Sequence, residues 1–129
     1  MNLLQGIHHV AIICSDYQCS KNFYHKVLGL KVIAENYREE QNSYKLDLAL
    51  PCGGQIELFS FPNRPERPSY PEARGLRHLA FKVTNVDAAV EHLVSHDIAV
   101  EPIRIDEFTQ KRYTFFTDPD NLPLELYET

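Results

Sequence analysis

The sequence predicts an α+β protein made of two βαβββ modules, because the same order of elements occurs twice along the chain. Seven positions separate His9 from Asp16, and seven separate His78 from Asn85. In both halves a strand carrying the histidine precedes a helix, and the last strand carries a Glu-Leu pair. Glu57 follows His9 by 48 positions, and Glu125 follows His78 by 47. An internal repeat accounts for all these spacings together.

The first module covers about residues 5–61. Residues 7–14 are apolar and β-branched, which predicts a strand. A helix follows over 15–30, with Ser15 or Asp16 as its N-cap and Gly29 at its end. Further strands are expected at 31–37, 43–50 and 55–61, with a turn at the PCGG segment, 51–54.

The second module covers residues 76–129 and follows a proline-rich linker at 62–75. A strand is predicted at 76–83, and then a helix over 84–97 that is capped by Thr84 or Asn85. Three more strands are expected at 98–105, 111–117 and 122–128, with a tight turn at the DPDN segment, 118–121. We expect the two modules to form a single domain, residues 1–129.

The composition excludes several classes of protein. The chain has 129 residues, of which 43% are hydrophobic and 24% charged, as in an ordinary globular domain. Its net charge of −5 disfavours a nucleic-acid partner. No apolar run reaches the roughly 18–20 residues that span a bilayer, and the N-terminus does not resemble a secretory signal. Three widely spaced cysteines favour a reduced, cytoplasmic protein. The expected partner is a small-molecule substrate.

Polar residues inside apolar strands identify the candidate site. Successive strand residues point to opposite faces, so at most one of His8 and His9 should line a given site. A carboxylate such as Glu57 or Glu125 is costly in an apolar strand unless it is paired, protonated or bound to a metal. Each half would contribute one histidine and one glutamate, and such a set suits a divalent transition metal.

Several motifs carry a family resemblance over essentially the whole chain: HHVAI, IELF, LRHLAFKV and the final DPDN.PLELYE. The chain resembles the vicinal-oxygen-chelate superfamily, which includes glyoxalase I, and most of all its YaeR-like group. The resemblance implies a U-shaped mixed sheet around one metal ion, bound by His9, Glu57, His78 and Glu125. It selects His9 over His8. The implied metal is Zn, Ni, Co, Mn or Fe, with Zn or Ni favoured.

The activity that the resemblance implies is that of a metal-dependent lyase or isomerase. Its substrate would be small, oxygenated and anionic, and would react through a metal-stabilised enediolate with Glu125 as the base. Glutathione-binding members place Arg and Asn where this chain has Ile13 and Phe61, which argues against glutathione. The alternatives are a dioxygenase or thiol transferase on the same fold, or a non-catalytic small-ligand-binding module. A homodimer is compatible with each.

Cations and aromatic side chains form a second group of candidates. They are either solvated or structural, or else some of them hold the anionic part of the substrate and wall its pocket. The cations are Arg64, Arg67, Arg74, Arg77, Lys111 and Arg112, and the aromatic residues are Phe59, Phe61, Tyr113 and Phe115.

Overall fold

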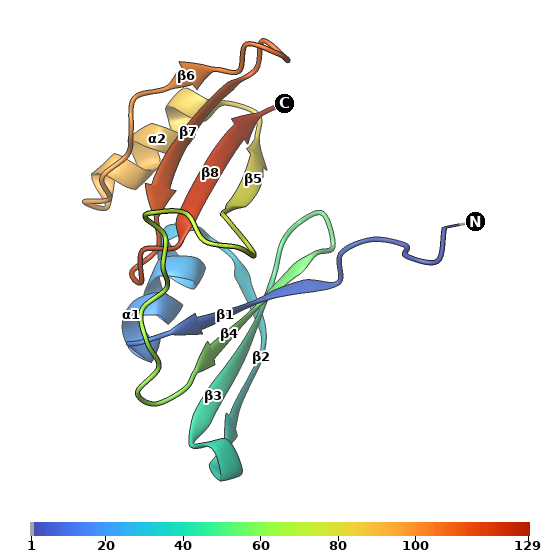
Figure 1. The fold of residues 1–129 in the computed structure, drawn as a ribbon, viewed down its shortest axis with the longest axis vertical. Helices are drawn as coiled ribbons and strands as arrows, with labels where there is room; N and C mark the ends of the chain where they lie inside the picture. The colour runs from blue at the N-terminus through green and yellow to red at the C-terminus, as the bar shows by residue number, and fades with distance from the viewer. Residues whose placement is uncertain (1) are drawn as a thin grey trace. The chain divides into compact units, whose positions relative to one another are not determined.

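The computed structural model describes residues 2–129 and contains two compact units in sequence, one ending at Pro65 and the next beginning at Glu66. Each unit consists of one four-stranded mixed sheet and its helices, so the protein has an α+β fold (Figure 1). Within the described residues, no helix is long and apolar enough to cross a membrane.

The first unit has the sheet order β1-β4-β3-β2, in which β1 and β4 are parallel and the other pairs antiparallel. Asp16 caps the first helix by accepting a hydrogen bond from the Cys19 backbone N–H at 3.1 Å. The elements are β1 (His9–Cys14), α1 (Tyr17–Lys21), the π-helix η1 (Asn22–Val27), β2 (Lys31–Arg38), the 3₁₀-helix η2 (Glu39–Gln41), β3 (Ser43–Ala49) and β4 (Gln55–Ser60).

The second unit repeats this topology with the order β5-β8-β7-β6. Here β5 pairs with β8 in parallel, whereas the β8–β7 and β7–β6 pairs are antiparallel. Asn85 caps α2 by accepting from the Ala88 N–H at 3.0 Å. The elements are β5 (Leu79–Val83), α2 (Val86–Ser95), β6 (Arg104–Ile105), β7 (Arg112–Thr117) and β8 (Pro123–Glu128).

Two expectations about individual elements need correction. The helix expected over 15–30 is α-helical only through Lys21 and continues as a π-helix, in which the Leu28 N–H donates to the Phe23 carbonyl at 2.9 Å. The strand expected at 98–105 is reduced to two residues, Arg104–Ile105. Pro102 has no N–H to donate there, which accounts for part of this loss.

One face of each sheet is the core. Along β3 and β4, alternate residues are almost fully buried, and this leaves the intervening residues on the opposite face. Cys14 is 2% exposed on the buried side, as expected for a small core residue. The buried strand residues include Leu46, Leu48, Ile56, Leu58, Leu124 and Leu126. The polar candidates therefore occupy the other face of each sheet.

Candidate metal centre

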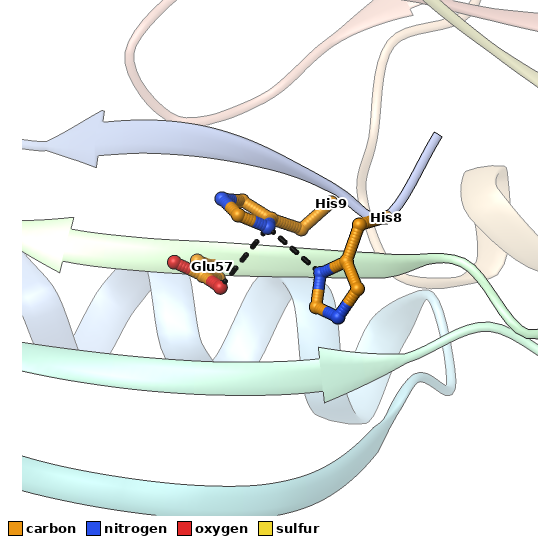
Figure 2. Close-up of side chains that lie close together, drawn as sticks. All are labelled: His8, His9 and Glu57. Atoms are coloured by element: carbon orange, nitrogen blue, oxygen red, sulfur yellow. Dashed lines mark hydrogen bonds and ion pairs between the residues drawn. The ribbon is translucent and has the colours of Figure 1, made fainter. Parts of the chain in front are cut away.

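His9 and Glu57 meet on the non-core face of the first sheet. In the parallel β1–β4 ladder, His9 pairs with Gln55 and Ala11 with Glu57, so both polar side chains share a face. His9 Nδ1 lies 3.3 Å from Glu57 Oε2. Figure 2 shows the two side chains turned toward each other. The Glu57 side chain is 12% exposed and that of His9 40% exposed. The pair is thus open on the histidine side.

A second carboxylate, Asp47, lies directly opposite Glu57 in the β3–β4 ladder. Like charges at opposed positions repel each other. Lys45 compensates this repulsion, because its Nζ is 2.8 Å from Asp47 Oδ1 and 3.8 Å from Glu57 Oε1. Asp47, for which the sequence suggested no role, is therefore part of a charge cluster around Glu57.

His8 does not follow the expected alternation. His8 stands just before β1, its carbonyl accepts from the Gln55 N–H at 3.2 Å, and its ring turns toward His9 (Figure 2). The two Nδ1 atoms are 2.9 Å apart, and one must donate while the other accepts. His8, His9 and Glu57 each offer one potential ligand atom, and these three atoms all lie within 4.8 Å of one another. The two rings thus lie together although strand alternation predicts that they diverge, and the choice of His9 over His8 as a ligand stays a prediction.

The second sheet holds the equivalent pair. His78 Nε2 lies 3.3 Å from Glu125 Oε1, and the side chains are 30% and 12% exposed. Glu125 pairs with Ala80 on β5, as Glu57 does with Ala11 on β1. His78 stands just before β5 on the same face as Ala80. The repeat seen in the sequence therefore extends to the geometry of the two histidine–glutamate pairs.

The surroundings of Glu125 combine aromatic and acidic side chains. Phe115 lies opposite it in the β7–β8 ladder, and the His78 ring meets Phe115 edge-on at 5.0 Å between centroids. An open hollow of about 440 Å³ adjoins this pair. Its lining consists of Ile105, Asp106, Glu107, Phe108, Tyr113, Phe115 and Glu125.

Each pair fits a divalent metal ion by its own geometry. Two ligand atoms about 2.1 Å from one ion, at angles of about 90–109°, lie about 3.0–3.4 Å apart. Both histidine–glutamate separations are 3.3 Å. Nε2 is the His78 nitrogen that faces Glu125, whereas Nδ1 is buried and lacks, in the described part of the chain, the outer hydrogen-bond partner that a metal-bound histidine normally has. Imidazole and carboxylate together suit transition metals.

The chain belongs to the Glyoxalase/Bleomycin resistance protein/Dioxygenase superfamily, whose sequence pattern it matches over residues 6–126. This agrees with the paired βαβββ topology and confirms the resemblance found in the sequence. Proteins of this superfamily typically bind a divalent metal ion, and the clustered ligand atoms of His8, His9 and Glu57 are compatible with that property.

The chain is similar over nearly its whole length to several particular proteins. It is 63% identical over 126 residues to the uncharacterized protein YwkD of Bacillus subtilis, with 98% of each chain covered. It is 61% identical over 125 residues to the uncharacterized protein YaeR of Escherichia coli, with 97% covered. A glyoxalase family protein from Enterococcus faecalis is 52% identical with a TM-score of 0.92, covering 98% of this chain and 100% of that one.

Proposed function

We propose that the protein is a metal-dependent lyase or isomerase of the glyoxalase I type, acting on a small, oxygenated, anionic molecule. The single observation that carries this proposal is the repetition of one histidine–glutamate pair at the same register position in two sheets. In this proposal the two pairs, His9–Glu57 and His78–Glu125, hold one divalent ion, with Zn or Ni favoured.

The bound ion would supply Lewis-acid stabilisation of an oxyanion on the substrate. Glu125 is the residue proposed to move a proton at the carbon next to a carbonyl. It lines an open hollow and has Phe115 opposite it in the ladder, whereas Glu57 lies 3.8 Å from Lys45. This contrast supports Glu125 as the base and Glu57 as the metal-holding counterpart.

The face around Glu57 argues against glutathione as co-substrate. Ile13, on the same face of β1, is 50% exposed and offers no charge or hydrogen bond. Phe61 follows β4 and packs parallel to Phe59 at 5.7 Å. Neither Ile13 nor Phe61 can itself hold a glutathione carboxylate, so any carboxylate on this face must be bound by other residues.

A second candidate function rests on the position of His8. Two histidines and one carboxylate, here His8, His9 and Glu57, form the ligand set typical of non-haem iron oxygenases. Under that reading the metal is iron, the ligands come from the first unit alone, and His78 is dispensable for metal binding. The two candidates therefore disagree about His8 and His78.

Metal content of variants distinguishes the candidates. We expect about one divalent ion per chain in protein purified without chelator, strongly reduced in His9→Ala and His78→Ala and retained in His8→Ala. Elemental analysis is paired with a screen of 2-oxoaldehydes with and without glutathione. Iron that depends on His8 but not on His78, together with oxygen uptake, would instead support the dioxygenase. Bound metal without any turnover would favour a binding module.

Mixing variants tests the homodimer that belongs to the proposal. His9→Ala chains and His78→Ala chains, unfolded and refolded together, regain metal at one site per dimer only if each site takes one pair from each chain. If both pairs of a site come from one chain, the mixture stays metal-poor. Sedimentation of the parent protein reports the oligomeric state directly.

A further inference from the structure

Arg38 lies across the non-core face of the first sheet. It ends the edge strand β2, opposite Ser43 of β3, and its guanidinium carbon is 4.9 Å from the centre of the Phe59 ring on β4. Because β3 lies between β2 and β4, the side chain reaches across β3 toward the Phe59 ring. Ser43 is small and fully buried, which leaves room for this crossing.

A second arginine approaches the same aromatic pair. Phe59 and Phe61 are stacked with an interplanar angle of 5°, and Arg38 also lies 5.5 Å from the centre of the Phe61 ring. Arg64 lies 5.3 Å from that centre. Asn63 adopts a left-handed conformation with φ of 54°, which asparagine tolerates, and turns the chain between Phe61 and Arg64. Two guanidinium groups therefore share one aromatic surface.

These two cations have no acidic partner among residues 2–129. No ion pair joins either guanidinium to a carboxylate, and Arg38 Nε is buried without a hydrogen-bond partner. Arg38 is half-buried, and burial of a charge is costly without a compensating anion, whereas Arg64 is exposed to solution. Cation–π contact offsets only part of that cost. An anion from solution would complete the arrangement.

The cluster lies beside the proposed metal pair. Phe59 is two residues beyond Glu57 on the same face of β4, about 7 Å along the strand. Lys45, which pairs with Phe59 in the ladder, faces the same side. With Arg38 and Arg64, this face has three cations against the two carboxylates of Glu57 and Asp47.

We propose that Arg38 and Arg64, held against Phe59 and Phe61, form a binding site for the carboxylate or phosphate group of a small ligand. We call it the Arg38–Arg64 site. The planar forks of the two arginines suit oxyanions. The site rests on the proposed function in one respect: it makes the substrate an acid or phosphate ester whose charged end binds on the same face as the His9–Glu57 pair.

The test measures anion binding by the full chain without metal. Arginine Nε–Hε resonances are followed by NMR in chelator-treated protein, free of phosphate buffer, during separate titrations with inorganic phosphate and with pyruvate. The resonance that disappears in Arg38→Gln identifies Arg38. We expect it to shift saturably with at least one probe, and the responding probe shows whether phosphate or carboxylate is preferred.

Matched variants make the test specific. Arg38→Gln should weaken binding about tenfold or more, since charged hydrogen bonds are lost. Arg104→Gln is the control, because Arg104 also lies over two rings, Tyr113 and Phe115, but is paired with Glu101 at 2.9 Å. It should bind the probe within about twofold of the parent. Arg64→Gln, outside the strands, replaces Arg38→Gln if that variant does not fold.

Two results would overturn the proposal: an Arg38 resonance that neither probe shifts, or an arginine variant that binds as well as the parent. Failure of the metal proposal leaves this test intact, because probe binding is measured without metal. Conversely, a metal-loaded protein that lacks anion binding keeps the proposed function and removes only the Arg38–Arg64 site. A parallel titration of metal-loaded protein separates binding at the ion from binding at the arginines.

Discussion

The two histidine–glutamate pairs have the same register but different neighbours. Glu57 faces Asp47 across the ladder and lies near Lys45, whereas Glu125 faces Phe115. Each unit thus keeps the same pair of residue types and changes the side chains around it. Within the proposed function this difference gives a division of labour: both pairs hold the ion, the charged first sheet also binds an anion, and Glu125 of the second sheet moves the proton.

The histidines differ in the same way. His9 is the more exposed of the two, and its ring contacts the ring of His8. His78 is packed edge-on against Phe115, and its Nδ1 is buried. A packed ring has a defined orientation, which is what precise proton transfer at the neighbouring carboxylate requires.

The largest effect is expected from exchanging the two carboxylates for amides. With saturating metal, Glu125→Gln should lower kcat about 10²–10⁴-fold, because the proton-transferring group is lost. Glu57→Gln should mainly weaken metal binding and retain more of kcat. Steady-state kinetics on a 2-oxoaldehyde turned over by the parent measures both. Equal losses of kcat in the two variants would contradict the division of labour.

Truncation of a buried leucine should destabilise the cores of the two sheets to the same extent. Leu58→Ala on β4 and Leu126→Ala on β8 each remove a buried leucine and should cost about 2–5 kcal/mol of unfolding free energy. Urea unfolding followed by circular dichroism measures the loss. A large asymmetry between the two would show that one sheet bears most of the stability.

Removing the cation between the two carboxylates should affect only the first unit. Lys45→Met leaves Asp47 and Glu57 opposed without compensation and should cost about 1–3 kcal/mol in metal-free protein. Tyr113→Phe, at the equivalent position of β7, changes no charge and serves as the control. The penalty should shrink when metal is added, since the ion takes over the compensation. Unfolding with and without metal checks this.

Helix caps give a smaller, symmetrical effect. Asp16→Ala and Asn85→Ala each remove the side-chain acceptor of one backbone N–H at a helix start. Each should cost about 1 kcal/mol. Thermal unfolding of the two variants measures the loss of stability at each helix. If removal of a cap leaves the unfolding temperature unchanged, tertiary packing holds that helix start instead.

The smallest effect concerns pH. Hydrogen bonds from Lys21 and then from Tyr17 hold the pKa of Glu35 below its usual value of 4.5. The folded pKa is lowered, so the stabilisation is present above the unfolded pKa and is lost as pH falls through the folded one. Glu35→Gln should therefore flatten the decline in stability below about pH 4.5. Urea unfolding between pH 7 and pH 3 measures the slope.

Much of the architecture follows from local features of the sequence. The repeat, the helix starts at Asp16 and Asn85, and the faces of the strands follow from spacing, capping chemistry and alternation, all of which act over a few residues. For the same reason the sequence by itself singled out His9, Glu57, His78 and Glu125. The strand predicted at 98–105 is longer than the two residues of β6, because the spacing of apolar residues does not determine how many hydrogen bonds form to the neighbouring strand.

The tertiary structure decided what surrounds these residues. Asp47 lies opposite Glu57, and Phe115 opposite Glu125, because of a register between strands that are distant in sequence. The turn of His8 toward His9 depends on where β1 begins, and the crossing of Arg38 to Phe59 depends on the order of the strands. Residue spacing along one chain contains no information about cross-strand register, so these neighbours emerge only when the sheets assemble.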